Sequence, residues 1–216
     1  MVACGDADGA VTGNTRRFGA SLEKIKQVVE ARTGEIMFGL NLVVHKGKTI
    51  FVGDTSVHEY PTSEQMAKIA TSAARVVRLF GFDPKVAFVS HSTFGQPLTN
   101  RTKHIKNAVE ILREKNVDFE FDGDMQPDVA LNEEYKNLYP FSKIVGNANI
   151  LIMPGQHSAA ISYKMMKTLG DTKVIGPLLI GLGLPIEIAP LRSSTSEILN
   201  LASIAAYSAD VIDYKK

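Results

Sequence analysis

The sequence predicts an α/β protein: a layered αβα fold with a mostly parallel sheet and an antiparallel hairpin at one edge. Two observations lead to this fold class. Short apolar runs rich in β-branched residues alternate along the chain with longer segments whose apolar residues recur every three or four positions. In addition, His45-Lys46-Gly47 separates two apolar runs, which is typical of the tight turn in a hairpin.

The helical segments share an apolar stripe with a period near 3.6 residues. The strongest begins at Ser63, where the stretch 63–66 offers a capping residue, and Gly81 is placed to end it. The expected helices, in chain order, cover residues 21–31, 63–80, 103–115, 158–169 and 194–209.

The expected strands are compact apolar runs, and Lys85–Ser90 has the character of a buried parallel strand. They cover residues 36–44, 48–53, 85–90, 117–121, 149–153, 172–175 and 185–188. In a sheet of this kind ligands gather beyond the carboxyl ends of the strands, so the loops that follow strands are the first places to look for function.

The composition is that of an ordinary globular protein, with 44% hydrophobic and 22% charged residues. A formal net charge of +1 gives no overall attraction to nucleic acid or to a membrane surface. Cys4 is the single cysteine, which excludes an intrachain disulfide and a thiolate metal cage. No secretory signal or membrane-length apolar run occurs, so we expect a cytoplasmic protein. No HExxH motif is present and the histidines are scattered, so we expect no metal site.

Two of the loops that follow strands carry hydroxyl or carboxyl groups. Residues 90–97 include Ser92 and Thr93 beside a glycine whose amide can approach an anion closely, although a polar turn explains the same residues. Asp122-Gly123-Asp124 offers two carboxylates for a metal or for acid–base work, but a turn is the simpler interpretation.

Three further segments favour an anion. His157 and Ser158 open a helix, where Ser158 is a candidate cap and backbone N–H groups attract negative charge. Arg192 and Ser193 precede another helix, whose Ser194 and Glu197 also fit a capping box. Near the N-terminus, the run 6–17 places Thr15 and Arg16 after a glycine-containing stretch; it lacks the GK[ST] ending of a P-loop.

Taken together, these stretches resemble the phosphate acetyl/butyryltransferase family. The segment Asp6–Gly13 (DADGAVTG) resembles the family's E-A-D-G-x-V-S-G, and Val86–Gly95 resembles its strand and S-x-S-T-x-G loop. The segment Phe121–Gln126 (FDGDMQ) resembles its D-G-E-x-Q, and Gly176–Pro185 its G-P-x-x-x-G…P. The similarity runs in the family's order from near residue 3 to the C-terminus.

Within the family the chain is most similar to the C-terminal domain of bacterial hybrid NADP-dependent malic enzymes, through four segments. These are Phe51–Thr62, Ser92–Pro97, Tyr139–Phe141 and Ile175–Gly183. The resemblance implies a cleft for acetyl-CoA or an acyl phosphate between two lobes, in a domain that continues N-terminal to Met1. NADP and a divalent metal would then be used only by the N-terminal malic enzyme part, with no cofactor in this segment.

The resemblance also implies a division of the chain. Residues 1–25 would end the first lobe, residues 26–189 would form the second, and residues 190–216 would return as a helix toward the first. The implied ligand-binding residues are Thr15, Arg16, Ser92, Thr93, His157, Ser158, Arg192, Ser193 and Glu197.

Departures from the family's pattern affect the residues of acetyl transfer. Aligning on Gly176 places Pro190 and Leu191 where the transferases carry Ser-Arg, and Glu197 at their acid. Phe94 stands at the Lys of S-T-K-G, and Glu23 at an arginine. Transfer from CoA sulfur to phosphate needs thiolate and phosphate charge to be neutralised, so these changes weaken the chemistry.

We therefore expect a homo-oligomeric, acetyl-CoA-sensing domain with a degenerate transferase site. Two alternatives remain at this stage. One is an active free-standing phosphate acyltransferase in which Arg192, Ser193 and Arg16 replace the usual groups. The other is an assembly module that chiefly holds an oligomer together.

Overall fold

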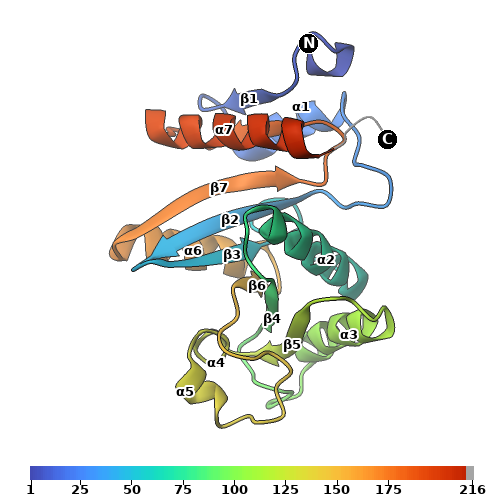
Figure 1. Cartoon of the computed structure of the whole chain (residues 1–216), viewed down its shortest axis with the longest axis vertical. Helices are drawn as coiled ribbons and strands as arrows, with labels where there is room; N and C mark the ends of the chain where they lie inside the picture. The colour runs from blue at the N-terminus through green and yellow to red at the C-terminus, as the bar shows by residue number, and fades with distance from the viewer. Residues whose placement is uncertain (213–216) are drawn as a thin grey trace.

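The structure, a computed structural model, describes residues 1–212 of the 216. Figure 1 shows two layers of different size: a small upper part that holds both ends of the chain, and a larger sheet with its helices below. In chain order the elements are η1 Val2–Cys4, β1 Ala10–Gly13, α1 Phe18–Lys26, β2 Phe38–His45, β3 Lys48–Gly53, α2 Ser63–Leu79, β4 Lys85–Val89, α3 Asn100–Glu114, β5 Glu120–Met125, α4 Pro127–Leu131, α5 Glu133–Lys136, β6 Ile150–Ile152, α6 Gln156–Leu169, β7 Thr172–Ile180, β8 Ile186–Ala189 and α7 Thr195–Val211.

The larger sheet has six strands in the order β5-β4-β6-β3-β2-β7. The neighbours from β5 to β3 are parallel, whereas β2 is antiparallel to both β3 and β7. The α/β fold class, the mostly parallel sheet and the hairpin are thereby confirmed. The hairpin is not at the edge, however, because β7 extends over nine residues and covers β2.

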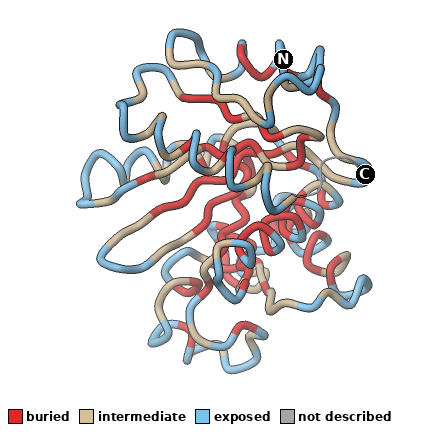
Figure 2. Tube along the Cα trace, turned by 45° about the horizontal axis from the view of Figure 1, so that its top comes forward, coloured by how far each residue is buried: buried red, intermediate tan, exposed pale blue. Residues whose placement is uncertain are grey.

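Two apolar layers flank this sheet. On one side α2 and α3 pack over Phe38, Phe51, Phe88 and Ile152. On the other side α4 and α6 cover a second cluster that includes Val43 and Val89. Figure 2 shows buried residues concentrated in the central strands and helices and exposed residues in the outer loops. Burial on both faces explains why these strands are continuous apolar runs in the sequence.

The helix α2 forms where its apolar stripe predicts, and Thr62 rather than Ser63 is its cap. Thr62 Oγ1 accepts from the Gln65 amide while Gln65 Oε1 accepts from the Thr62 amide, which is a capping box. At its other end Gly81 adopts a φ of 82°, a conformation that glycine adopts without strain.

The smaller sheet joins the two ends of the chain. Strands β1 and β8 pair in parallel from Ala10↔Ile186 to Gly13↔Ala189, and α7 and α1 pack against them. Residues 186–189, which the expected division assigns to the second lobe, therefore lie beside residues 10–13. The division itself stays a prediction, and residues 213–216 of its last part lie outside the described residues.

Three strands differ from the sequence-based expectation. Asp122-Gly123-Asp124 lies inside β5 rather than in a turn, because Gly123 packs so close to Phe88 that a Cβ would come within 2.7 Å of the Phe88 Cβ. Likewise, Gly176-Pro177 lies within β7, since the expected strand 172–175 continues to Ile180. The strand β1 was not expected, because its four residues show no clear alternation.

Candidate functional site

The loop after β3 is fixed by one buried carboxylate, Asp54, which is 1% exposed. Its Oδ1 accepts from the amides of Gly39 (2.8 Å), Ser56 (2.9 Å) and Val57 (3.1 Å). Its Oδ2 accepts from the His58 amide at 2.8 Å and lies 2.7 Å from His58 Nδ1. Sequence reasoning missed this role, because most of the partners are backbone amides that only the fold identifies.

Beside this loop lies a buried amide with an unused donor. Thr55 Oγ1 donates to Asn41 Oδ1 at 2.7 Å, and Asn41 is fully buried on β2. Asn41 Nδ2 has no hydrogen-bond partner among the described residues. Because buried polar atoms are nearly always satisfied, this amide marks a polar site within the sheet. A signal existed in the sequence, since an asparagine interrupts an otherwise apolar run.

The loop after β4 turns its hydroxyls inward. Ser92 Oγ donates to Asp124 Oδ2, and the Gly95 amide donates to Asp124 Oδ1 at 2.9 Å. Thr93 Oγ1 accepts from the Gln126 amide at 3.2 Å. Both Ser92 and Thr93 are buried, so in this conformation their hydroxyls join neighbouring loops rather than present themselves to a ligand.

Phe94, which follows in the same loop, belongs to an aromatic cluster. Its ring centroid lies 4.8 Å from that of Phe141 and 5.5 Å from that of Tyr139. Phe94 adopts a φ of 50°, which is uncommon for a residue with a side chain. The position is therefore occupied by an apolar packing group.

His157, at the first turn of α6, lies next to the loop after β3. His157 Nε2 is 3.3 Å from Glu59 Oε1, and its ring stacks on Tyr60 with centroids 6.2 Å apart. The other ring interaction of Tyr60 is with the Arg101 guanidinium, 5.8 Å from the centroid. The group is exposed and carries both signs of charge. A Cβ on Gly155 would approach Glu59 O to 2.5 Å, so glycine is required for this contact.

Ser158 is not the cap of α6. The N-cap is Gly155, without a side-chain hydrogen bond, and Ser158 Oγ donates back to Gly155 O at 2.8 Å. No side chain caps the first amides of the helix, and the Gln156 amide donates to the Glu59 carbonyl at 3.2 Å.

The residues from the two chain ends form a separate group. The Arg192 amide donates to Asn14 O at 3.2 Å, which brings Thr15 and Arg16 to the segment 192–193. Ser193 Oγ donates to Pro190 O at 2.8 Å, and both arginine residues are exposed. The buried Asn14 Oδ1 has no partner within residues 1–212.

Glu197 is fully engaged. Its Oε2 accepts from the Ser194 amide (2.8 Å) and Ser194 Oγ (2.9 Å), and its Oε1 from Lys167 Nζ (2.6 Å). The hydrogen bond from Lys167, followed by that from the Ser194 amide, lowers the pKa of Glu197. The capping box that the sequence predicted at Ser194 is confirmed.

The predicted residues therefore do not converge on one point. Lys167, which holds Glu197, lies ten positions after His157 on α6, about 15 Å along the helix axis. One group contains Thr15, Arg16, Arg192, Ser193 and Glu197, and a second contains His157 and Ser158. A third, buried group contains Ser92 and Thr93.

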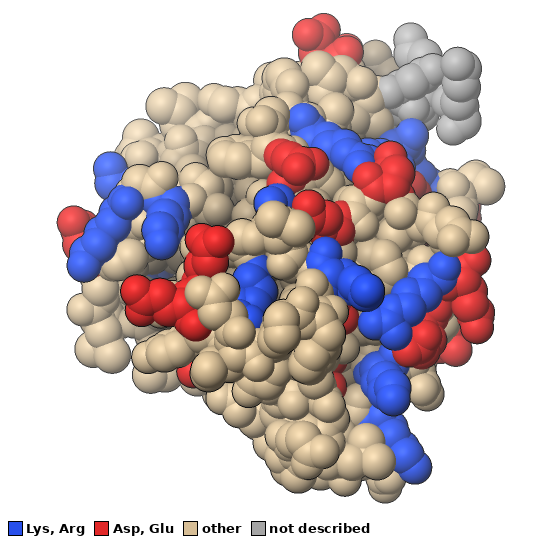
Figure 3. Space-filling model, turned by 60° about the horizontal axis from the view of Figure 1, so that its bottom comes forward, with Lys and Arg blue, Asp and Glu red and all other residues tan. Residues whose placement is uncertain are grey.

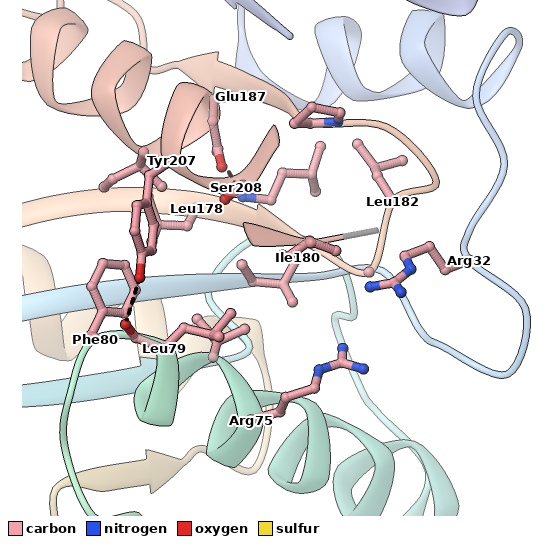
Figure 4. A pocket seen from close by; sticks show the side chains of 16 residues that line it. Arg32, Arg75, Leu79, Phe80, Leu178, Ile180, Leu182, Glu187, Tyr207 and Ser208 are labelled. Atoms are coloured by element: carbon pink, nitrogen blue, oxygen red, sulfur yellow. Dashed lines mark hydrogen bonds between the residues drawn. The ribbon is translucent and has the colours of Figure 1, made fainter. Parts of the chain in front are cut away.

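A cavity of about 40 Å³ lies apart from these groups, between α2, β7 and α7. Figure 4 shows Glu187 on the β8 side and Arg32 and Arg75 across the cavity, with Tyr207 reaching to Leu79 O. Glu187 is 4% exposed, and its Oε2 accepts from the Leu179 amide at 2.9 Å. Burial raises the pKa of Glu187 to about 8, although the Leu179 amide opposes the shift.

The surface has no dominant charge. Figure 3 shows lysine and arginine interspersed with aspartate and glutamate over one face. Within residues 1–212 no three His, Cys, Asp or Glu side chains are placed to share a metal ion. In the same residues no helix is long and apolar enough to cross a membrane.

Known proteins resemble the chain over nearly its whole length. The profile of the phosphate acetyl/butaryl transferase family matches residues 1–206. An NADP-dependent malic enzyme of Rhizobium meliloti is 46% identical over 97% of the chain, which spans 28% of that enzyme. A phosphate acetyltransferase of Bacillus subtilis is 29% identical over 97% of the chain and 65% of its own length. A phosphotransacetylase structure from Streptococcus pyogenes superimposes with a TM-score of 0.89 at 30% identity, over 97% of this chain and 65% of that one.

Proposed function

The chain belongs to the phosphate acetyl/butyryltransferase family, and on that premise we propose that it is an acetyl-CoA-sensing regulatory and oligomerisation domain of an NADP-dependent malic enzyme. Conversion of malate to pyruvate and CO2, with NADP and a divalent metal, would occur in an N-terminal part outside this sequence. The 46% identity to the Rhizobium meliloti malic enzyme, of which this chain spans 28%, supports such a parent.

The packing of Phe94 is the main support for a degenerate transferase site. The transferase motif has a lysine at this position, whereas Phe94 packs against Phe141 and Tyr139. An ammonium group that neutralises phosphate or thiolate charge is therefore replaced by an aromatic contact. Electrostatic stabilisation of developing charge usually contributes more to such catalysis than any other effect, so its loss weakens transfer strongly.

Glu197 supports the same conclusion. As a general base it would have to take the proton of the CoA thiol, and basicity falls as pKa falls. Both of its oxygens already accept hydrogen bonds, and its pKa is lowered by Lys167. The residue is thus better suited to hold α7 and α6 together than to accept a proton.

The geometry nonetheless favours binding of a long anion. The two exposed groups lie at opposite ends of α6, one with Arg16 and Arg192 and the other with His157 at a helix N-terminus that no side chain caps. Acetyl-CoA carries phosphates at one end and an acyl thioester at the other. A ligand of that shape is able to contact both groups at once. If binding changes the distance between the two groups, α6, which connects them, would move as well. Coupling of this kind requires two states with different affinity for the ligand.

The test is isothermal titration of the intact parent protein with acetyl-CoA, beside an acetyl-phosphate formation assay on the same sample. We expect heat of binding without turnover. Substituting Arg16, Arg192 or His157 by alanine should weaken binding, and Lys106→Ala, on an exposed position of α3, should not. Absence of binding would refute the sensing role, and turnover would refute the degenerate site.

An active free-standing phosphate acetyltransferase is the second candidate. It is favoured by the TM-score of 0.89 to the Streptococcus pyogenes phosphotransacetylase and by the contact of Arg192 with Asn14 beside Arg16. In that case acetyl phosphate should form from acetyl-CoA and phosphate, and Arg192→Ala should abolish it.

A further inference from the structure

The cavity between α2, β7 and α7 lies where the two parts of the fold meet. Its walls come from α2 and β7 on the side of the larger sheet, and from β8 and α7 on the side of the smaller one. Its volume of about 40 Å³ holds roughly three water molecules, or the five or six non-hydrogen atoms of a short carbon chain. A helix or strand of another chain is far larger, so the size favours a small molecule.

The walls of the cavity are mostly aliphatic. Tyr207 Oη donates to Leu79 O at 3.1 Å on one side, as Figure 4 shows. The lining also includes Leu178 and Ile180 from β7 and Ile204 from α7. Transfer of methylene groups from water to such walls is favourable, so they suit the carbon chain of a ligand.

Glu187 places a hydrogen-bond donor on the β8 side of the cavity. The residue is 4% exposed, and its Oε2 accepts from the Leu179 amide at 2.9 Å, whereas its Oε1 makes no hydrogen bond within residues 1–212. Burial raises the pKa of Glu187 to about 8, so the carboxyl carries a proton at neutral pH. With Oε2 engaged as an acceptor, the proton lies on Oε1. Because buried donors are nearly always satisfied, we expect an oxygen of a ligand to accept from this group.

Arginine side chains lie on the opposite side of the cavity. Figure 4 shows Arg32 and Arg75 across the cavity from Glu187. Arg75 Nη1 donates to Glu35 Oε1 at 2.5 Å, and this is the one hydrogen bond of its guanidinium within the described residues. A guanidinium has several further N–H donors, so those of Arg75 remain for an anion. Two arginines against one glutamate leave this side positive, which favours a carboxylate.

We propose that this cavity binds a short aliphatic keto acid. Its ketone oxygen accepts from Glu187, its methylene groups lie against the aliphatic walls, and its carboxylate pairs with Arg75. The inference goes beyond the proposed function and does not rest on acetyl-CoA binding. Because the walls come from both parts of the fold, the bound acid would hold α2 and α7 together.

Isothermal titration of the intact parent protein with levulinate tests the site. Levulinate carries a ketone, two methylene groups and a carboxylate; pentanoate lacks the ketone, and methyl propyl ketone lacks the carboxylate. At about pH 6.5 levulinate should bind at least about tenfold more tightly than either, which is the usual effect of one such polar contact. Levulinate that binds no more tightly than either compound, or not at all, would overturn the proposal.

A pair of arginine variants locates the carboxylate. Arg75→Met should weaken levulinate binding by about tenfold and leave methyl propyl ketone unaffected. Arg78→Met is the matched control, since Arg78 follows on the same helix, pairs with Asp118 and does not line the cavity. Equal loss in the two variants, or no loss in Arg75→Met, would contradict the proposed contact.

The pH dependence of binding tests the contact with Glu187. Tyr207, Arg32 and Arg75 are the other titratable or charged side chains that line the cavity, and Glu35 pairs with Arg75. Burial and the Leu179 amide alone shift the pKa of Glu187, so none of these four groups holds its charge.

Above about pH 8 Glu187 loses the proton that the ketone accepts, so levulinate affinity should fall by about tenfold between about pH 6.5 and about pH 9. Glu187→Gln keeps N–H donors and does not ionise, so its affinity should stay constant over this range. Glu114→Gln, on an exposed position of α3, should follow the wild-type chain. Constant affinity in the wild-type chain, or the same fall in Glu187→Gln, would refute the contact.

Discussion

Glu187→Gln should stabilise the chain near neutral pH and have little effect in mild acid. The carboxyl is buried, accepts one amide hydrogen bond from Leu179 and has a pKa raised to about 8. Between the ordinary glutamate pKa of 4.5 and about 8 the folded chain keeps a proton that the unfolded chain has released. The stability from this group is therefore fully present below about pH 4.5 and is lost as the pH rises toward 8.

The size of the effect follows from the same linkage. Each pH unit in this window lowers the free energy of unfolding by about 1.4 kcal/mol, so the loss at pH 7 is on the order of 3 kcal/mol. Glutamine keeps the acceptor for the Leu179 amide and never ionises. At pH 7 the variant should be more stable by up to about 3 kcal/mol, and the difference should vanish near pH 4.5.

Urea unfolding followed by far-UV circular dichroism, between about pH 5 and pH 8, measures this difference. Glu114→Gln, at an exposed position on α3, is the control and should change stability by less than about 0.5 kcal/mol at every pH. Parallel pH dependence in the wild-type chain and Glu187→Gln would show that the carboxyl is not held neutral, and the reasoning from burial would then be wrong.

Three further changes test other features. Gly13→Ala should destabilise the chain by more than about 2 kcal/mol in urea, because its Cβ would lie 2.3 Å from Ala189 O at a φ of 106°; an unchanged midpoint would contradict this. Glu197→Gln should make stability less sensitive to acid. The pKa of Glu197 is lowered in the folded chain, so its carboxylate stabilises the fold at pH values above the ordinary glutamate pKa, and this stabilisation is lost as the pH falls through the folded-state pKa. Acid titration followed by circular dichroism measures the difference. Phe94→Ala should lower the unfolding free energy by about 1–3 kcal/mol through lost ring contacts, and equal stability would argue against the aromatic cluster.

The sequence allowed most of the fold to be predicted, because the local pattern and the tertiary structure agree there. The stripe from Met66 to Phe80 matches the face that α2 buries, and the turn at His45–Gly47 joins the two paired strands. Local pattern failed where a distant neighbour decides the backbone. Asp122–Asp124 looks like a turn and is a strand, because Gly123 fits against Phe88 of β4.

The site was less predictable for the same reason. The glycine and hydroxyl residues predicted that the loop at Ser92 could bind a ligand. They did not predict that the Ser92 hydroxyl points inward, because that direction depends on Asp124 in a neighbouring strand. The role of Asp54 is invisible in sequence, since three of its partners are amides of its own loop and another belongs to Gly39. Composition identified groups suited to anions, and only the fold could show that α6 separates them.

The pairing of β1 with β8 has a consequence for how the molecule assembles. Ala10 pairs with Ile186, which lies far along the chain, so the pair forms only when a very long loop closes. Closing so long a loop is slow and entropically unfavourable. We therefore expect this pair to form last during folding and to open first under native conditions, as a cooperative unit of low local stability. Amide hydrogens of residues 10–13 should exchange faster than those of β4, so the surface that carries Arg16 and Arg192 would be dismantled before the rest of the protein unfolds.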